Sequence, residues 1–203
     1  MPAASCLWRC LAAFGLIAIG GGAPAFAGSK LLHTTDYRSH PVSGTTAAAT
    51  LQSMNANPII DPDDGPAYAN LTHDHDVGIR TAMAGGTCRV ADLTFRWRFV
   101  LTLPEAADYG RMGPAMQKAW TDFRASLKKH EEGHRTIFLG CGKTFVAAAA
   151  KLTKPGNCGG LEQTVRGYLD KQYAACMAKQ REYEKLDRPR VMASPFIRAA
   201  LGR

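Results

Sequence analysis

The amino-acid sequence predicts an α+β fold in which a small, mostly antiparallel sheet packs against a long helical hairpin. Residues 88–103 alternate apolar and polar side chains with a period of two, which is typical of a strand with one buried face. From Pro114 onward, apolar side chains recur at spacings of three and four, which is typical of a helix with one buried stripe. We therefore expect one domain over residues 28–203, with a strand-rich part at 28–104, the hairpin at 114–187 and an irregular tail at 188–203.

The first 27 residues have the organisation of a secretory signal peptide. Arg9 precedes a short apolar run, and Ala25-Phe26-Ala27 supplies a small-x-small cleavage site. The run is shorter than the roughly 20 residues that a membrane-spanning helix needs. We expect a mature N-terminus at Gly28, which N-terminal sequencing can test. The protein would then be exported, periplasmic or extracellular, with no membrane segment after cleavage.

Shorter elements precede the long strand. Residues 37–43 could form a short strand and residues 45–56 a short helix, while residues 57–66 are rich in turn-forming residues. The segment 67–84 is followed by two glycines, which favours a hairpin with the long strand. Pro104 is expected to end that strand.

The helices of the hairpin are bounded by proline and glycine. The first is expected to begin at Pro114, because proline suits the first turn of a helix, and to stop at residues 154–157. The glycines at 140 and 142 could kink it. The second helix is expected at residues 161–186, and the prolines beyond it mark the irregular tail.

Four cysteines remain after the signal, and an even number in an exported protein usually forms disulfides. Cys158 and Cys176 would lie about 27 Å apart along a continuous second helix. A bridge needs Cα atoms within roughly 7 Å, so these two cannot pair. Cys141 and Cys176 lie at similar heights in the predicted hairpin. We therefore expect Cys141–Cys176 and Cys88–Cys158.

The net charge of +8 raises the question of an anionic partner such as nucleic acid. The basic residues are scattered along the chain, and no nucleic-acid-binding motif is present. A basic but otherwise ordinary surface is therefore the simpler interpretation, and we expect no nucleic-acid partner.

His130-Glu131-Glu132-Gly133-His134 has the pattern H-E-x-x-H and falls on the buried stripe of the first helix. Residues four apart share a helix face, so both imidazoles can bind one metal ion. Zinc (Zn²⁺) suits this arrangement because it accepts nitrogen and oxygen ligands and lowers the pKa of bound water to about 7. Glu131 could then accept the proton of that water as general base. The alternative is that the two histidines pair with carboxylates across a groove.

The motif and its surroundings resemble the signature of a bacterial family described as predicted secreted zinc-dependent proteases and long catalogued as a domain of unknown function. The residues that match this signature are Trp120, Phe123, Leu127, His130, Glu131, Gly133 and His134. Upstream, weaker features follow the order of the family: Tyr37, the segment 41–45, the Asn57-Pro58 turn, Thr72, Cys88 and Leu103-Pro104. The resemblance implies export, a zinc site at His130 and His134, and Glu131 as general base.

One segment departs from that family. Its members usually end with a stretch of the type Tyr-Asp-x-x-Thr-x-His-Gly. Here Tyr183 is kept, Glu184 replaces the aspartate, and Pro189 occupies the position of the histidine. If that histidine supplies the third metal ligand in relatives, it cannot do so in this chain.

The hairpin itself offers a replacement ligand. Positions at equal distances from the connecting turn lie at equal heights in an antiparallel pair of helices, which puts residues 182–187 level with the two histidines. Glu184 falls on the inner face of its helix, so we expect it to be the third ligand. Asp187, or His73 and His75 in the preceding strand region, are the alternatives.

Together these features predict a zinc-dependent metallohydrolase, in particular a peptidase that acts on a peptide or protein substrate. Glu131 would be the base, zinc would polarise the carbonyl group, and Tyr183 could donate a hydrogen bond to the oxyanion. The alternative is a zinc-binding or interaction protein of the cell envelope that has lost turnover, as the altered C-terminal segment suggests.

Overall fold

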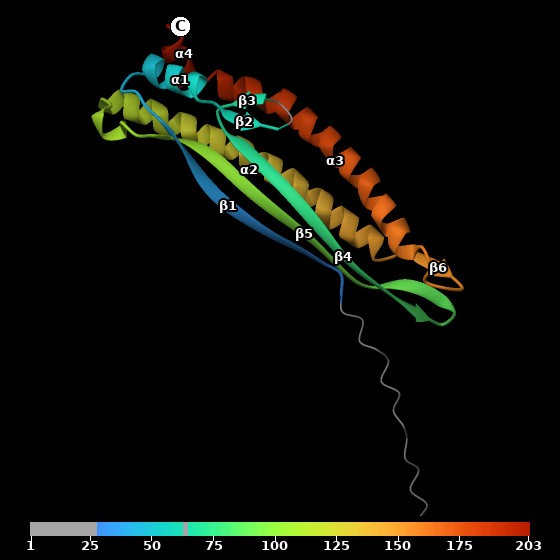
Figure 1. The fold of residues 1–203 in the computed structure, drawn as a ribbon. Coiled ribbons are helices and arrows are strands. Elements are labelled where there is room, and N and C mark those ends of the chain that lie inside the picture. Colours follow the sequence, from blue (N-terminus) through green and yellow to red (C-terminus); the bar gives the residue numbers. More distant parts are fainter. Residues whose placement is uncertain (1–27, 63–64) are drawn as a thin grey trace, which may run out of the picture.

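A computed structural model describes residues 28–62 and 65–203, so the predicted signal peptide lies outside the described residues. In chain order the elements are β1 (Lys30–Val42), α1 (Ala47–Ala56), β2 (Ile59–Asp61), β3 (Gly65–Ala67), β4 (Asn70–Ala84), β5 (Thr87–Ala106), a 3-10 turn (Tyr109–Arg111), α2 (Pro114–Ala149), β6 (Thr153–Pro155), α3 (Leu161–Met192) and α4 (Pro195–Ala200). The predicted α+β fold is confirmed: α2 and α3 run side by side along a long twisted sheet (Figure 1). Within the described ranges no helix is long and apolar enough to span a membrane.

The long strand predicted from its alternation is β5, and it forms the centre of the sheet. It pairs with β4 in antiparallel register from Asn70↔Thr102 to Ala84↔Thr87, and with β1 in parallel register. The side chains of one face are almost fully buried: Leu93, Phe95, Trp97, Phe99, Leu101 and Leu103. The period of two therefore identified the core face of the sheet.

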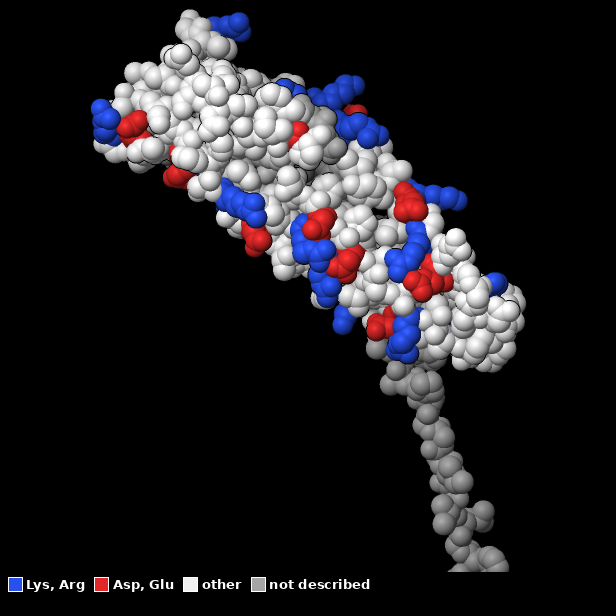
Figure 2. Space-filling view, viewed as in Figure 1, with Lys and Arg blue, Asp and Glu red and all other residues white. Residues whose placement is uncertain are grey.

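The opposite face of the sheet carries charged pairs instead. Arg98 lies 2.7 Å from Asp74 and 2.6 Å from Asp76, and Arg96 lies 3.2 Å from Asp76. Figure 2 shows such mixed blue and red side chains over this part of the molecule. All four side chains are more than a third exposed, so these pairs keep the face solvated and add little stability.

The expected ends of two strands were wrong. β5 continues through Pro104 to Ala106, because β4 ends its pairing at Thr102 and leaves that edge of β5 open beyond it. A proline, which has no N–H to donate, is tolerated where a strand is paired on one side only. β1 begins at Lys30 rather than near residue 37. Its side chains are mostly exposed, so it carries no alternating pattern that the sequence could reveal.

The helix α2 runs without interruption from Pro114 to Ala149, through both glycines. Gly142 has a packing role. A Cβ atom there would lie 2.9 Å from Nε1 of Trp97 and 3.0 Å from Cδ1 of Leu31. Glycine at this position lets α2 approach the sheet closely.

The C-terminal segment is helical and not an irregular tail. α3 extends through Pro189 to Met192, and α4 follows. Proline removes one helical hydrogen bond, a tolerable loss only a few residues before the end of the helix. Phe196 is fully buried and stacks on Phe123 with ring centroids 4.7 Å apart. Burial of α4 in the core thus orders a segment that looks irregular in sequence.

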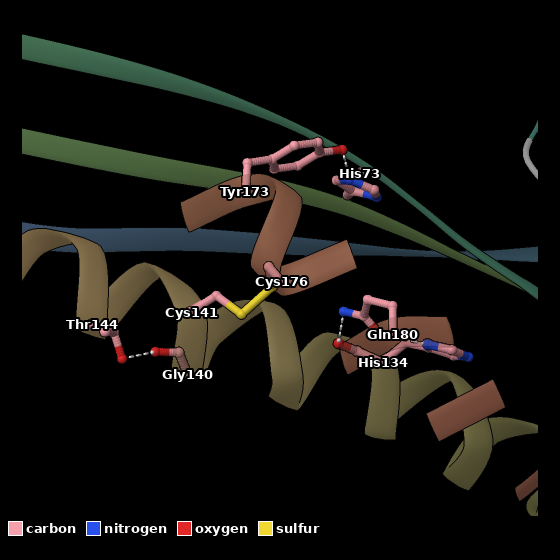
Figure 3. The surroundings of a disulfide bond; sticks show 8 residues. All are labelled: His73, His134, Gly140, Cys141, Thr144, Tyr173, Cys176 and Gln180. Carbon is pink, nitrogen blue, oxygen red and sulfur yellow. Dashed lines mark hydrogen bonds between the residues drawn. A yellow bond between two sulfur atoms is a disulfide. The ribbon is translucent and has the colours of Figure 1, made fainter. Parts of the chain in front are cut away.

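Both predicted disulfides are present. Cys88–Cys158 joins β5 to the loop before α3, with a Cα–Cα distance of 5.0 Å. Next to it the short strand β6, which the sequence did not indicate, pairs with β5. Cys141–Cys176 joins α2 to α3, with a Cα–Cα distance of 6.0 Å (Figure 3). The second bridge fixes the height of one helix against the other.

Candidate metal centre

Three potential metal ligands meet between α2 and α3. His130 and His134 project from α2, and Glu184 projects from α3 to meet them. Oε2 of Glu184 lies 2.9 Å from Nε2 of His130 and 3.3 Å from Nε2 of His134, and the two Nε2 atoms are 3.2 Å apart. One potential ligand atom from each residue lies within 4.8 Å of the others. This group could hold a metal ion.

Asp187 orients the first imidazole. Its Oδ2 lies 2.8 Å from Nδ1 of His130. Arg190 holds the same carboxylate with two hydrogen bonds of 2.8 Å, from Nε to Oδ1 and from Nη2 to Oδ2. These bonds hold the pKa of Asp187 well below its usual range, the arginine contributing most and His130 adding to it. The carboxylate is therefore ionised and accepts the Nδ1–H of His130.

Gln180 orients the second imidazole in a different way. Its Nε2 donates to the backbone carbonyl of His134 at 3.0 Å, and its Oε1 lies 2.7 Å from Nδ1 of the same residue (Figure 3). A carbonyl oxygen can only accept, so the amide nitrogen must face it and the amide oxygen must face the ring. His134 therefore also carries its proton on Nδ1.

The Nδ1 contacts of the two histidines leave the centre of the group without a hydrogen-bond donor. Each Nδ1–H is used outside the group, so both Nε2 lone pairs point inward at a carboxylate oxygen of Glu184. Three acceptors then converge without a donor between them, an arrangement that a proton or a metal cation satisfies. The donor set thus fits a cation bound by two imidazoles and one carboxylate.

The imidazoles and carboxylates of this group also shift one another's pKa values. Burial alone lowers the pKa of His130, but its hydrogen bonds with Glu184 and Asp187 outweigh burial, and the pKa is raised. The hydrogen bonds from His130 and His134 correspondingly hold the pKa of Glu184 far below its usual range. A metal ion and a proton therefore compete for the same place in the group.

Glu131 is the buried acid of the site. It is only 6 % exposed, although it follows His130 directly on the helix. Burial raises its pKa to about 7, and the neighbouring His130 and His134 reduce that rise. It lines the same cleft as the three potential ligands.

The cleft has a volume of about 970 Å³ and lies between the α2–α3 hairpin and the segment from Pro58 to His73. Its walls combine the metal group with apolar side chains such as Leu71, Leu127 and Met177. The site is therefore open to a ligand larger than water.

Tyr183 lies behind the metal group and is absent from the cleft lining. Its hydroxyl donates to the backbone carbonyl of His130 at 3.3 Å, and its ring stacks on the His130 imidazole with centroids 5.4 Å apart. The ring packs directly on Gly133, where a Cβ atom would lie 2.8 Å from Cε1 and would overlap the hydroxyl. Gly133 of the motif thus admits Tyr183, and Tyr183 supports the helix that carries the histidines.

The alternative ligands take other positions. Asp187 contacts the outer nitrogen of His130, as described. His73 lines the cleft, but its Nε2 lies 3.0 Å from the hydroxyl of Tyr173, and Figure 3 shows this pair apart from His134. His75 packs on Trp97, with ring centroids 5.0 Å apart. Neither of these histidines belongs to the metal group.

Sequence reasoning missed the orienting roles of Gln180, Asp187 and Arg190. A signal was present, because Gln180 and Asp187 lie four before and three after Glu184, on the same face of α3. That spacing indicates which residues share a face. It does not indicate which ring nitrogen of a histidine each would contact.

Comparison with known protein families shows which family the chain resembles. A family described as "Bacterial protein of unknown function (DUF922)" matches residues 37–188, a range that includes His130, His134 and Glu184. No curated protein and no solved structure matches the chain. The description names no activity, so the match supports the bacterial family and leaves the protease part of the resemblance a prediction.

Proposed function

Since the chain belongs to the DUF922 family of bacterial proteins of unknown function, we propose its function from the site: an exported zinc-dependent hydrolase that cleaves peptide bonds. One observation carries the proposal. A buried carboxylic acid, Glu131, lines an open cleft together with a His130–His134–Glu184 group that could hold a metal ion. An acid, a candidate metal group and space for a ligand therefore occur together.

The donor set supports zinc as the metal. Two imidazoles and one carboxylate are a combination that catalytic zinc sites use, and three protein ligands leave a fourth position open. When bound, zinc supplies Lewis acidity and lowers the pKa of a water ligand to about 7. Asp187 and Gln180 support the same assignment, because they keep both histidines in the form whose Nε2 can bind a cation.

Glu131 is proposed as the general base. Burial raises its pKa to about 7 in the metal-free protein, and a nearby cation favours its ionised form. An ionised carboxylate that lines the cleft can accept a proton from water and return it to a leaving amine. Tyr183, which sequence reasoning assigned to the oxyanion, has its hydroxyl on the backbone of α2. We assign it a positioning role instead.

The two disulfides fit an exported location. Both disulfides join elements far apart in sequence, at separations of 70 and 35 residues. Such bridges form and persist in oxidising compartments. We therefore propose that the protein acts in the periplasm or outside the cell.

Metal analysis and hydrolysis assays on the protein without residues 1–27 test the proposal. We expect about one zinc per chain, kept in Glu131→Gln and lost in His130→Ala and His134→Ala. Hydrolysis of a mixed peptide library should vanish in Glu131→Gln, because the amide cannot accept a proton. Glu132→Gln is the matched control, since Glu132 is absent from the cleft lining and lies 3.7 Å from Lys128. Full activity in Glu131→Gln would refute the mechanism.

A zinc-binding protein without turnover is the second candidate. The observation that favours it is Pro189, which lines the cleft where the resembled family has a histidine. This candidate predicts stoichiometric zinc in the wild-type protein together with no cleavage in the same peptide library.

A further inference from the structure

Three basic side chains of α3 line the cleft beside the metal group. Arg181, Lys185 and Arg188, which we call the basic rim, lie at spacings of four and three and therefore share one helix face. Figure 2 shows Lys and Arg side chains projecting from the edge of the molecule formed by α3. The basic rim places positive charge where a ligand in the cleft would pass.

Among the described residues, the three cations of the basic rim have little or no pairing with carboxylates. Arg181 and Lys185 are exposed and have no ion pair or hydrogen bond within residues 28–62 and 65–203. Arg188 makes one long contact, 3.7 Å from its Nη1 to Oε1 of Glu184. That oxygen is not the Glu184 atom that faces the two histidines. The basic rim is thus available to an external anion.

The cleft differs between its two ends. Glu184 lies within the stretch of α3 that carries the basic rim, so the rim adjoins the metal group. Toward the start of α3 the cleft lining holds no Lys, Arg, Asp or Glu among the described residues; it is formed by His73, Phe138, Tyr173 and Met177. A ligand that spans the cleft therefore meets cations beside the metal group and largely apolar surface toward the start of α3.

The charge balance of the described lining residues supports an anionic ligand. The three cations of the rim match three carboxylates: Asp61, Glu131 and Glu184. A bound divalent cation leaves the cleft positive, and a concave site concentrates the field of such charges. Arginine binds carboxylates in particular, with paired N–H donors that match the two oxygens.

We propose that the basic rim is a subsite for the side-chain carboxylate of a peptide, so that the protein selects peptides with an acidic residue beside the metal group. The substrate class rests on the proposed hydrolase function, whereas the binding preference does not require turnover. A binding experiment therefore separates the two.

The experiment measures fluorescence anisotropy with zinc-loaded protein that carries Glu131→Gln, so that bound peptide is not consumed. The probe is a decapeptide of alternating glutamate and alanine with a neutral fluorophore and an amidated C-terminus. Its counterpart replaces glutamate with glutamine. We expect the acidic peptide to bind at least about tenfold more tightly at moderate salt.

Substitutions in the basic rim test whether these residues cause the preference for the acidic peptide. Arg181→Gln combined with Lys185→Gln should weaken binding of the acidic peptide by about fivefold or more and leave the glutamine peptide unchanged. Lys171→Gln combined with Lys179→Gln is the matched control. It removes the same charge from exposed positions of the same helix that are absent from the cleft lining. Zinc content is measured in both variants, so that a lost metal is not mistaken for a lost subsite.

Four results would overturn the proposal. Equal weakening in both double variants would show a general effect of net charge. An oligonucleotide of the same charge that binds as tightly as the acidic peptide would point to a different polymer. A glutamine peptide with a free C-terminal carboxylate that binds as tightly would assign the rim to a chain terminus. Cleavage of peptides without acid preference would also refute the subsite and leave the hydrolase standing. Acid-selective binding without wild-type cleavage would refute the hydrolase alone.

Discussion

Replacing Gly133 with alanine tests how closely α2 and α3 must approach for the metal group to form. The added Cβ atom would overlap the hydroxyl and ring of Tyr183. That side chain cannot turn away cheaply, because its hydroxyl donates to His130 and its ring stacks on the His130 imidazole. The Cys141–Cys176 bridge also limits how far α3 can move as a whole.

The expected cost follows from three contributions. Overpacking of a buried contact costs about 1–3 kcal/mol. Loss of the hydrogen bond from Tyr183 to the His130 carbonyl adds about 1 kcal/mol. Alanine returns about 0.5–1 kcal/mol, because glycine is the poorer residue inside a helix. We therefore expect Gly133→Ala to lower the free energy of unfolding by about 1–3 kcal/mol, which corresponds to a fall in Tm of roughly 2–4 °C per kcal/mol.

Thermal unfolding of the metal-free protein measures this change, and zinc titration should show weaker binding in the same variant. Gly140→Ala is the matched control, since no atom lies within 4 Å of a Cβ at that position of the same helix. It should be neutral or stabilising. Adding Tyr183→Ala to Gly133→Ala should remove the overlap, so the two costs should not add. A Gly133→Ala protein that gained stability as Gly140→Ala does would refute the packing argument.

Three further predictions concern the metal group and its support. Glu184→Ala should lose at least about tenfold in zinc affinity, about 1.4 kcal/mol, while His73→Ala stays near wild type; calorimetric titration measures both, and the reverse pattern would move the site. Asp187→Ala should weaken zinc binding by about 10–100-fold, because the His130 ring loses the acceptor that orients it; an unchanged affinity in the same titration would contradict that role. Joint replacement of Cys141 and Cys176 by serine opens a loop of 35 residues and should cost about 4 kcal/mol in denaturant unfolding. A loss below about 1 kcal/mol would show that the bridge constrains the unfolded chain little.

The elements that sequence reasoning identified are those whose pattern is local. Strict alternation of apolar and polar residues predicts β5, and an apolar stripe with an initial proline predicts α2. β1 and α4 could not be recognised in the same way. β1 lies at an edge of the sheet with most of its side chains exposed, so no periodic pattern marks it. α4 is ordered because Phe196 meets Phe123, a contact between residues more than seventy positions apart.

The residues of the site also differ in whether a local sequence pattern reveals them. His130 and His134 are visible in sequence because two ligands four apart on a helix form a local pattern. Glu184 could be placed because helix rise converts residue counts into heights along a hairpin. Its helix face favoured Glu184 over Asp187, which lies near the same height, and the structure brings Glu184 to Nε2 and Asp187 to Nδ1 of His130. Which of them reaches Nε2 and which reaches Nδ1 depends on the orientation of the imidazole ring.

The parallel pairing of β1 with β5 has a consequence for the order in which the protein folds. Lys30 pairs with Thr94 and Val42 with Ala106, so every contact of this ladder closes a loop of 64 residues. The β4–β5 hairpin is more local, and local contacts form sooner because less chain entropy is lost. A chain that crosses a membrane N-terminus first presents β1 long before its partner strand arrives. We therefore expect β1 to pair with β5 only after the β4–β5 hairpin has formed.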